Sequence, residues 1–188
     1  GKVTTIIGPN GCGKSTLLKA ASRLIKPMGG QVLLNGQDIL KIPRKTFAKQ
    51  VSILPQVRTV PNITVEGLVM HGRFPHLGYS RRYSKKDKEI AQYAMEQTGI
   101  AQFAYKNLLE LSGGERQKVY IAMVIAQDTQ VVFLDEPTTY LDIKHQFEVM
   151  ALVHKLNQMG KTVVMVLHDL DLALTQSGHI VLMEEGNL

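Results

Sequence analysis

The chain has 188 residues, of which 44% are hydrophobic and 20% are charged, and its net charge at pH 7 is +6. This length and composition predict one globular domain with a continuous core and exclude a disordered chain. No apolar run reaches the roughly 18 residues that a membrane-spanning helix needs, and a single cysteine, Cys12, excludes an internal disulfide.

Short runs of β-branched and apolar residues predict six strands. In chain order they are Val3–Ile7, Gln31–Leu34, Val51–Leu54, Val131–Leu134, Thr162–Leu167 and Ile180–Met183. The fourth and fifth runs show no alternation with polar residues, which is typical of parallel strands covered by helices on both faces. The Asn35-Gly36 pair is a hairpin-turn signal, so a small antiparallel part is also expected.

Helical periodicity predicts four helices. They are Ser15–Ile25, Lys86–Thr98, Gly114–Gln127 and Asp142–Asn157. Asp142 is the expected N-cap of the last helix. Its inward face is predicted to carry Phe147, Met150, Ala151, Val153 (or His154) and Leu156. The segment from residue 64 to residue 109 has helical signals and no strong strand signal, so we expect a helical subdomain inserted between two α/β halves.

The first motif along the chain is Gly8-Pro9-Asn10-Gly11-Cys12-Gly13-Lys14-Ser15. It matches the pattern G-x-x-x-x-G-K-[ST] between a predicted strand and a predicted helix, as that pattern requires. Glycines let backbone N–H groups converge on phosphate oxygens, and the helix that begins there adds unpaired N–H groups of its own. We expect Lys14 on the β- and γ-phosphates, Ser15 on Mg²⁺ and Thr16 near the α-phosphate. No redox or metal role is expected for Cys12.

Two carboxylates follow the predicted strand 131–134. Asp135 is positioned to hold Mg²⁺, directly or through water. Glu136 lies one residue further, near the γ-phosphate, where a base could polarise water. Acidic residues at a strand end are common by themselves, and the assignment depends on the phosphate loop elsewhere in the chain.

Polar residues also follow two other predicted strands. The amide of Gln56 can bind Mg²⁺ or the attacking water, and the imidazole of His168 could bond the γ-phosphate. Both lie at the carboxyl ends of strands, where ligands gather in open α/β sheets. The remaining histidines of the central part of the chain show no metal-ligand spacing, and we expect no metal site at His71, His76, His145 or His154.

The segment Leu111–Gln117 reads LSGGERQ and opens a predicted helix. Together the motifs resemble the full set of an ABC transporter ATPase, in the order Gly8–Thr16, Gln56, Leu111–Gln117, Val131–Glu136, Tyr140-Leu141-Asp142 and His168. The resemblance implies an α/β P-loop NTPase fold with a mainly parallel central sheet and a small antiparallel portion. Residues 1–56 and 110–188 would form a RecA-like core, and residues 57–109 the helical subdomain.

The resemblance also implies a mechanism, ATP hydrolysis by a head-to-tail homodimer with Mg²⁺. One subunit would grip the nucleotide with Lys14, Ser15, Asp135, Gln56, Glu136 and His168. The other subunit would cap the γ-phosphate with Ser112, Gly113 and Gly114. Asp142 would bond across the interface.

Finer features are similar to importers of iron(III)–siderophores, haem and cobalamin, among them GRFPH at residues 72–76 and LHDL at residues 167–170. They imply a transmembrane permease contacted through residues 57–109, an extracytoplasmic substrate-binding protein and a place on the cytoplasmic face of the membrane. Family members stack adenine on an upstream aromatic residue and continue past the region of Leu188. We therefore expect this chain to lack a piece at both ends.

Other interpretations stay open. A non-transport ABC ATPase could act on nucleic acid or ribosomes, but the segment 57–111 is too short for the long coiled coil of the chromosome-acting types. A non-enzymatic regulatory subunit is disfavoured by Lys14, Glu136 and His168, and a GTPase by the lack of an Asn-Lys-x-Asp motif.

The basic cluster Arg81–Lys86 is either a solvated loop and helix start or a docking surface beside anionic lipid or a partner protein. No nucleic-acid partner is expected.

Overall fold

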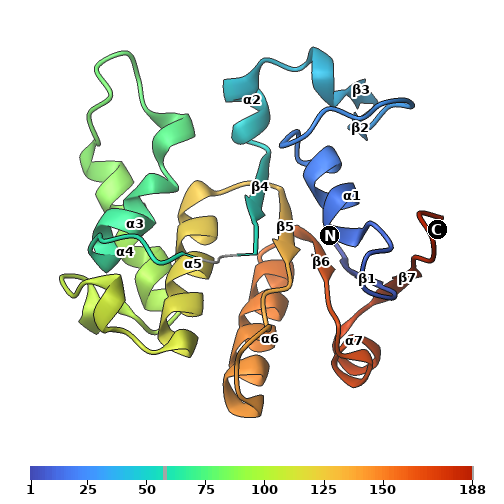
Figure 1. Ribbon diagram of the computed structural model, residues 1–188. Helices are drawn as coiled ribbons and strands as arrows, with labels where there is room; N and C mark the ends of the chain where they lie inside the picture. The colour runs from blue at the N-terminus through green and yellow to red at the C-terminus, as the bar shows by residue number, and fades with distance from the viewer. Residues whose placement is uncertain (57–58, 188) are drawn as a thin grey trace.

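The computed structural model describes residues 1–56 and 59–187 (Figure 1). Val57 and Arg58, at the predicted start of the helical subdomain, and Leu188 lie outside the described residues. A five-stranded sheet forms the centre, in the order β4-β5-β6-β1-β7, and every neighbouring pair is parallel. Its strands are β1 (Val3–Ile7), β4 (Val51–Leu54), β5 (Val131–Asp135), β6 (Thr162–Val166) and β7 (His179–Leu182).

The predicted antiparallel portion is confirmed as a hairpin of β2 (Leu33–Leu34) and β3 (Gln37–Asp38). Its turn residues Asn35 and Gly36 both have positive φ, 51° and 79°, as a tight two-residue hairpin requires. The strand predicted over residues 31–34 is shorter, because only its last two residues find partners on β3.

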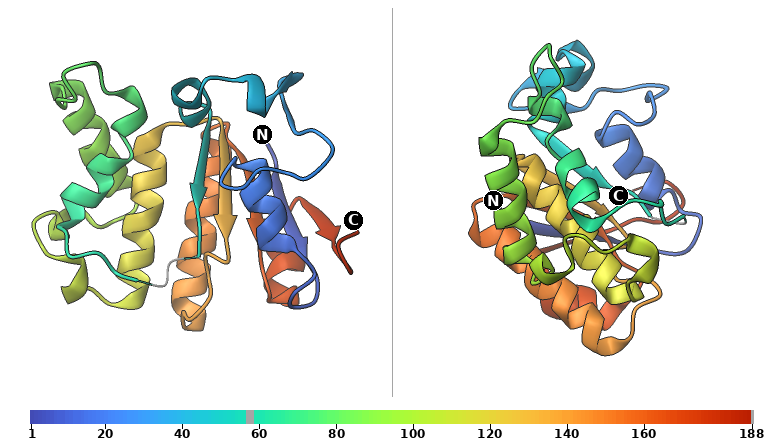
Figure 2. Two further views of the ribbon diagram at one scale, coloured as in Figure 1. Left: turned by 45° about the horizontal axis from the view of Figure 1, so that its top comes forward. Right: turned by 90° about the vertical axis from the view of Figure 1, so that its left-hand side faces the viewer.

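Helices cover both faces of the sheet, as the apolar strands predict (Figure 2). On one face lies α1 (Lys14–Ala21), whose Leu18 belongs to an apolar cluster with Ile6 of β1 and Val166 of β6. On the other face, α6 (Ile143–Gln158) packs against β6 and β1, and α7 (Leu170–Gln176) packs against β1. No residue of β5 or β6 is exposed, so the buried parallel sheet is confirmed.

The first helix is shorter than predicted, ending at Ala21 instead of Ile25. Arg23 takes a left-handed φ of 62°, which a helix cannot continue. Its guanidinium donates to the Ile42 carbonyl at 2.6 Å and lies 5.2 Å from the centre of the Phe47 ring. A contact from a distant segment therefore ends this helix.

The inward face of α6 is partly different from the predicted one. Phe147 is 52% exposed and Ala151 is also exposed. The buried residues are Val149, Met150, Val153 and Leu156. The sheet thus packs against a stripe rotated away from Phe147. Helix α7 was not predicted, although Asp169 supplies its N-cap by accepting a hydrogen bond from the backbone N–H of Leu172 at 2.9 Å.

Between residues 59 and 112 the described chain forms helices α3 (Val65–His71) and α4 (Lys85–Gln97) and the short 3₁₀ turns η2 (Phe74–His76), η3 (Ala101–Phe103) and η4 (Leu108–Glu110). Helices α3 and α4 pack against α5 (Gly113–Gln127), and apolar side chains of this region join one core with those of β5 and β6. A short helix, α2 (Arg44–Ala48), and the short turn η1 (Ile39–Lys41) precede β4. The division into a core and a helical subdomain stays a prediction. Among the described residues no helix is both long and apolar enough to cross a membrane.

A buried ion pair ties this helical region to the end of α5. Arg73 is 5% exposed; its Nε donates to Asp87 Oδ1 at 3.0 Å and its Nη1 to the Ala126 carbonyl at 2.7 Å. Hydrogen bonds from Ser84, followed by those from Arg73, lower the pKa of Asp87 to about 2. The carboxylate is therefore held in its charged form far below the pH at which it would protonate in an unfolded chain.

We expect this pair to make stability depend on acid. Because the pKa of Asp87 is lower in the folded state, its carboxylate stabilises the fold at pH values above its pKa in the unfolded chain, which is near 4. This stabilisation is lost as the pH falls towards 2. The difference in unfolding free energy between the parent and Asp87→Asn should therefore shrink by roughly 1 to 2 kcal/mol between pH 5 and pH 2, allowing for some screening by water. Urea unfolding at each pH measures it.

The control for this experiment is Glu89→Gln on the same helix. Glu89 forms an exposed pair with Lys85 at 3.8 Å, with side chains 64% and 92% exposed, and such a pair contributes little. Parallel stability curves for the parent and Asp87→Asn across this pH range would contradict the prediction.

Candidate active site

The glycine-rich loop between β1 and α1 has the conformation of an anion cradle. Gly8, Gly11 and Gly13 have φ values of 151°, 82° and 106°. At Gly8 a side chain is impossible, because its Cβ would lie 2.0 Å from the Met183 carbonyl oxygen. Helix α1 begins after Gly13 with no side chain capping its first N–H groups. These N–H groups are available to a phosphate, which a helix N-terminus favours.

Lys14 lies inside this loop and is only 5% exposed. Its ammonium group donates to the carbonyl oxygens of Gly8 and Pro9, each at 2.8 Å. No carboxylate of the described residues forms a salt bridge with it. Its positive charge is therefore held at the cradle by the loop itself. Cys12 is buried beside Ile6 and Leu18, so packing explains this residue.

Three parallel strands bring the other predicted residues together. Gln56 follows β4, Glu136 follows β5 and His168 follows β6, and these strands are neighbours in the sheet. Gln56 Nε2 donates to Glu136 Oε2 at 2.7 Å, and His168 Nε2 lies 2.5 Å from Glu136 Oε1. Glu136 itself has a left-handed φ of 55°. The three side chains meet at the carboxyl edge of the sheet, as predicted, and the hydrogen bonds that hold the carboxylate from both sides are an addition that the sequence did not reveal.

Thr139 is a site residue that the sequence did not reveal. Its hydroxyl donates to Glu136 Oε2 at 3.1 Å, and its backbone N–H donates to the Glu136 carbonyl at 3.3 Å. The signal available in the sequence is the spacing of three residues, which a tight turn closes.

Oxygen atoms that suit a cation lie where the start of α1 meets the end of β5. The Ser15 hydroxyl donates to Asp135 Oδ1 at 2.7 Å, and Asp135 is 3% exposed. Hard cations such as Mg²⁺ take oxygen ligands and usually keep substrate phosphates among them. The donor set fits such an ion. In the described part of the chain no cluster of three or more His, Cys, Asp or Glu side chains could hold a metal alone.

Three histidines outside the site have structural partners. His71 stacks on Phe74 at 4.6 Å, His76 Nε2 lies 2.8 Å from the Gln127 carbonyl oxygen, and His154 Nε2 lies 3.0 Å from Gln176 Oε1.

A cavity of about 210 Å³ opens at the cradle. Its lining residues are Asn10, Gly11, Gly13, Lys14, Ser15, Thr16, Glu136 and His168. It therefore combines a cationic, N–H-rich wall with a carboxylate and an imidazole. Gln56 and Asp135 lie behind this lining, in contact with Glu136 and Ser15 respectively.

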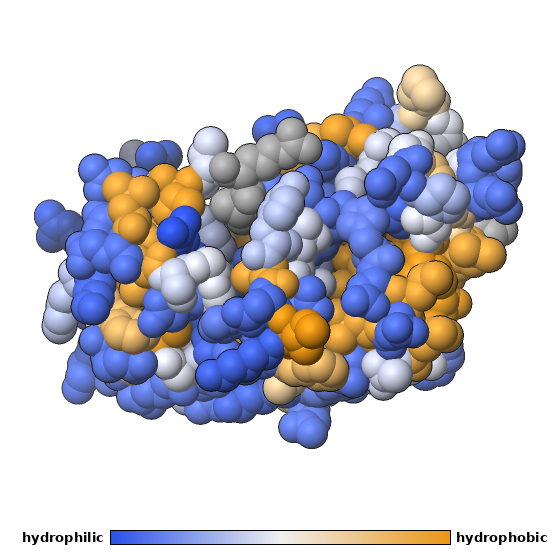
Figure 3. All heavy atoms as spheres, turned by 60° about the horizontal axis from the view of Figure 1, so that its bottom comes forward, coloured by the Kyte–Doolittle hydropathy of each residue, from blue (hydrophilic) through white to orange (hydrophobic). Residues whose placement is uncertain are grey.

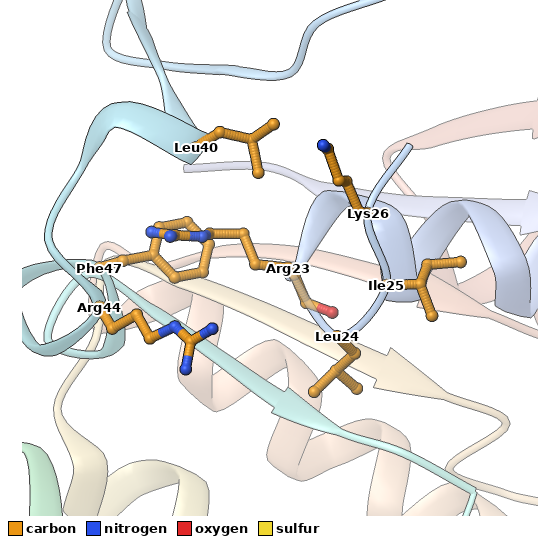
Figure 4. Close-up of a pocket in the computed structure, with 8 residues that line it drawn as sticks. Arg23, Leu24, Ile25, Lys26, Leu40, Arg44 and Phe47 are labelled. Carbon is orange, nitrogen blue, oxygen red and sulfur yellow. The ribbon is translucent and has the colours of Figure 1, made fainter. Parts of the chain in front are cut away.

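A larger cavity, of about 440 Å³, lies between the end of α1 and α2 (Figure 4). Arg23, Lys26 and Arg44 line it together with apolar side chains such as Leu40 and Phe47. None of the predicted site residues and no carboxylate contributes to its wall. Its size therefore does not make it the better candidate for catalysis.

The predicted signature turn does not line the cradle cavity. Ser112 is the exposed N-cap of α5, and its hydroxyl donates to Glu115 Oε2 at 2.7 Å in a capping box. Hydrogen bonds from the backbone and hydroxyl of Ser112 lower the pKa of Glu115. The N-terminal end of α5 lies at the same end of the molecule as the glycine-rich loop, with α6 between them (Figure 2, left). One protomer thus keeps the two halves of the predicted site apart.

Asp142 caps α6 and is also outside the cradle cavity. Its Oδ1 accepts hydrogen bonds from the backbone N–H of His145 at 2.9 Å and from the His145 ring. These bonds lower the pKa of Asp142, whose side chain is 66% exposed. The cap is as predicted; a bond from Asp142 to another protomer stays a prediction.

Figure 3 shows the face that is reached by turning the lower end of the molecule forward. Hydrophilic side chains cover most of it, and hydrophobic ones form separate patches. A permanent dimer interface is usually more continuously apolar.

Comparison with known proteins gives consistent matches. The family model described as "ABC transporter" matches residues 1–139. The chain is 47% identical over 190 residues to the iron(3+)-hydroxamate import ATP-binding protein FhuC of Bacillus subtilis (strain 168), covering 100% of this chain and 71% of that protein. It is 50% identical over 183 residues to the achromobactin transport ATP-binding protein CbrD of Dickeya dadantii (strain 3937), covering 96% and 68%.

Among solved structures, the dimeric post-hydrolysis state of the ATP-binding cassette MJ0796 bound to ADP and Pi has a TM-score of 0.82 at 28% identity. That comparison covers 98% of this chain and 82% of MJ0796. The fold is therefore shared with a protein seen as a nucleotide-bound dimer.

Proposed function

This chain belongs to the ABC transporter family of ATPases, and we propose that it drives the import of iron(III)–siderophores or related metal chelates. The named relatives at 47% and 50% identity are ATP-binding proteins for iron(3+)-hydroxamate import and achromobactin transport. The proposed partners are transmembrane permease subunits, contacted through residues 57–109, and an extracytoplasmic substrate-binding protein. The proposed location is the cytoplasmic face of the membrane.

One observation carries the proposed mechanism, the separation of the cradle from the signature turn. The cavity at the cradle contains Lys14, Glu136 and His168, whereas Ser112 caps a different helix outside it. A second copy, placed head to tail, would bring its Ser112–Gly114 turn to the open side of this cavity. Nucleotide then acts as the link between two polar faces that lack a continuous apolar surface. The related cassette MJ0796 has been seen as a dimer with ADP and Pi.

In the proposed reaction Glu136 takes a proton from the attacking water. The water oxygen forms a bond to the γ-phosphorus, the bond from that phosphorus to the bridging oxygen of ADP breaks, and ADP leaves with the bond's electron pair. Donors on both sides orient the carboxylate: Gln56 and Thr139 on one oxygen and His168 on the other. His168 also lines the cavity, and in the proposed reaction it would contact the γ-phosphate.

The remaining residues of the proposed site hold the nucleotide. The phosphates would be surrounded by the backbone N–H groups of Gly8, Asn10, Gly11, Cys12 and Gly13; Pro9 belongs to the same loop but has no N–H to donate. Lys14 would neutralise the phosphates, and Thr16 would contact the α-phosphate side. Ser15, Asp135 and the amide oxygen of Gln56 would hold Mg²⁺. When bound, this ion would offset negative charge on the phosphates. A second protomer would add Ser112, Gly113 and Gly114, with Asp142 bonding across the interface.

The transport function is tested with the chain reconstituted with its permease in proteoliposomes. We expect ATP turnover to rise when the substrate-binding protein delivers a ferric hydroxamate. We also expect iron to accumulate on the side of the membrane that carries the ATPase. Lys14→Ala serves as the control that lacks nucleotide binding. ATP turnover that does not change with the permease but rises with DNA or ribosomes would instead support the function of a non-transport ABC ATPase.

A further inference from the structure

The imidazole of His145 lies between two loops of the proposed composite site. On one side its Nδ1 lies 2.7 Å from Asp142 Oδ1, which ends the loop Tyr140–Asp142. A carboxylate oxygen only accepts hydrogen bonds, so Nδ1 carries the hydrogen. The ring is therefore fixed at one edge by the residue that caps its own helix.

On its other side the ring lies against the signature turn. A Cβ built at Gly114 would be 2.1 Å from His145 Cδ2 and 2.5 Å from Cγ. Gly114 is buried in the first turn of α5 and the His145 side chain is 30% exposed. The glycine thus leaves room for the ring, and the ring covers the backbone of the turn that Ser112 begins.

We propose that His145 is a positioning residue that holds the Ser112–Gly114 turn and the Tyr140–Asp142 loop in one fixed arrangement. The inference rests on the proposed two-protomer site, to which both segments would be presented together. His145 itself does not line the cradle cavity, so its proposed role is to hold other residues in place and not to bind phosphate.

Neighbouring contacts agree with a rigid unit. Leu141 Cδ2 lies 3.8 Å from the position of a Cβ on Gly113, so the loop also contacts the turn directly. One helical turn further along, Lys118 of α5 pairs with Glu148 of α6 at 2.6 Å, and this bond lowers the pKa of Glu148. Helices α5 and α6 are thus joined at two successive levels, of which His145 is the one nearest the nucleotide face.

The geometry shows which side chain can make the same contacts as the imidazole ring. Asparagine carries a nitrogen where His145 has Nδ1 and an oxygen where it has Cδ2, so it can still donate to Asp142 and cover Gly114. Alanine can do neither. In both variants the backbone N–H at position 145 still donates to Asp142, so the N-cap of α6 is retained.

The test uses His145→Ala and His145→Asn, with His154→Ala as the control on the same helix. We expect His145→Ala to lower kcat by about tenfold, the effect of losing one hydrogen bond to a charged group. KM and the ATP affinity of the monomer should stay unchanged. Introduced with Glu136→Gln, it should weaken ATP-dependent dimerisation by a similar factor. His145→Asn and His154→Ala should remain close to the parent.

Two results would overturn the inference while leaving the proposed function standing. In the first, His145→Ala turns over and dimerises like the parent. In the second, His145→Asn is impaired as strongly as His145→Ala. A parent protein that hydrolyses ATP as a monomer, with no dimer in ATP, would overturn the proposed two-protomer site and this inference with it.

Discussion

Replacing Glu136 by glutamine is expected to lower ATP turnover by about 10² to 10⁴, the usual contribution of a general base. Glutamine keeps the size of the side chain, but its amide cannot accept a proton from water. The fold should tolerate the change. The new amide oxygen can accept from Gln56, and its NH₂ group can donate to His168, whose Nε2 is able to act as an acceptor.

ATP binding should survive in this variant because the phosphates contact the loop and Lys14. We therefore expect Glu136→Gln to bind ATP by calorimetry with an affinity like that of the parent, and to remain dimeric in MgATP on size exclusion. Lys14→Ala should bind little nucleotide and stay monomeric.

Glu96→Gln is the matched control, since its side chain lies on the exposed face of α4. Steady-state ATP turnover near the parent level in Glu136→Gln would contradict the proposed role of Glu136 as the general base.

Replacing Ser112 by arginine is expected to lower turnover by about 10² or more, as loss of a donor to developing charge does in other enzymes. Arginine would also put a bulky side chain at the surface that a second protomer must approach. Binding of ATP to the monomer should not change, because Ser112 does not line the cradle cavity. Specific activity of the parent should rise with protein concentration, and that of the variant should not.

The chain offers a matched control for the structural effect of this substitution. Ser84 caps α4 with the same kind of capping box, in which Asp87 takes the place that Glu115 has beside Ser112. Ser84→Arg and Ser112→Arg should each lose about 1 kcal/mol of helix capping. Equal losses of turnover in the two variants would mean that helix stability, and not a second protomer, explains the effect.

Local patterns made much of the fold predictable from the sequence. The strand Val3–Ile7, the glycine-rich loop and the Asn35-Gly36 turn depend on backbone preferences over a few residues, and all three are present. The boundaries that differ were decided by distant contacts. Arg23 ends α1 through Ile42 and Phe47, and the sheet, not helical periodicity, decides that Phe147 of α6 is exposed.

The candidate site divides in the same way. Lys14, Asp135 and Glu136 could be identified because their types and spacing match the chemistry of phosphate binding. Thr139 and His145 could not, because their partners were unknown until the turn after β5 and the first turns of α5 and α6 were placed.

The sequence by itself determined the family and the phosphate loop, because both depend on short, contiguous motifs, and it supplied the candidate residues for hydrolysis. Only the tertiary structure decided which of them meet. Gln56 and Glu136 are 80 positions apart and His168 is 32 positions from Glu136, yet the strand order β4-β5-β6 joins all three by hydrogen bonds. The same packing places Ser112 outside their cavity. Contacts between distant segments depend on the order of strands and the packing of helices, which no local pattern specifies.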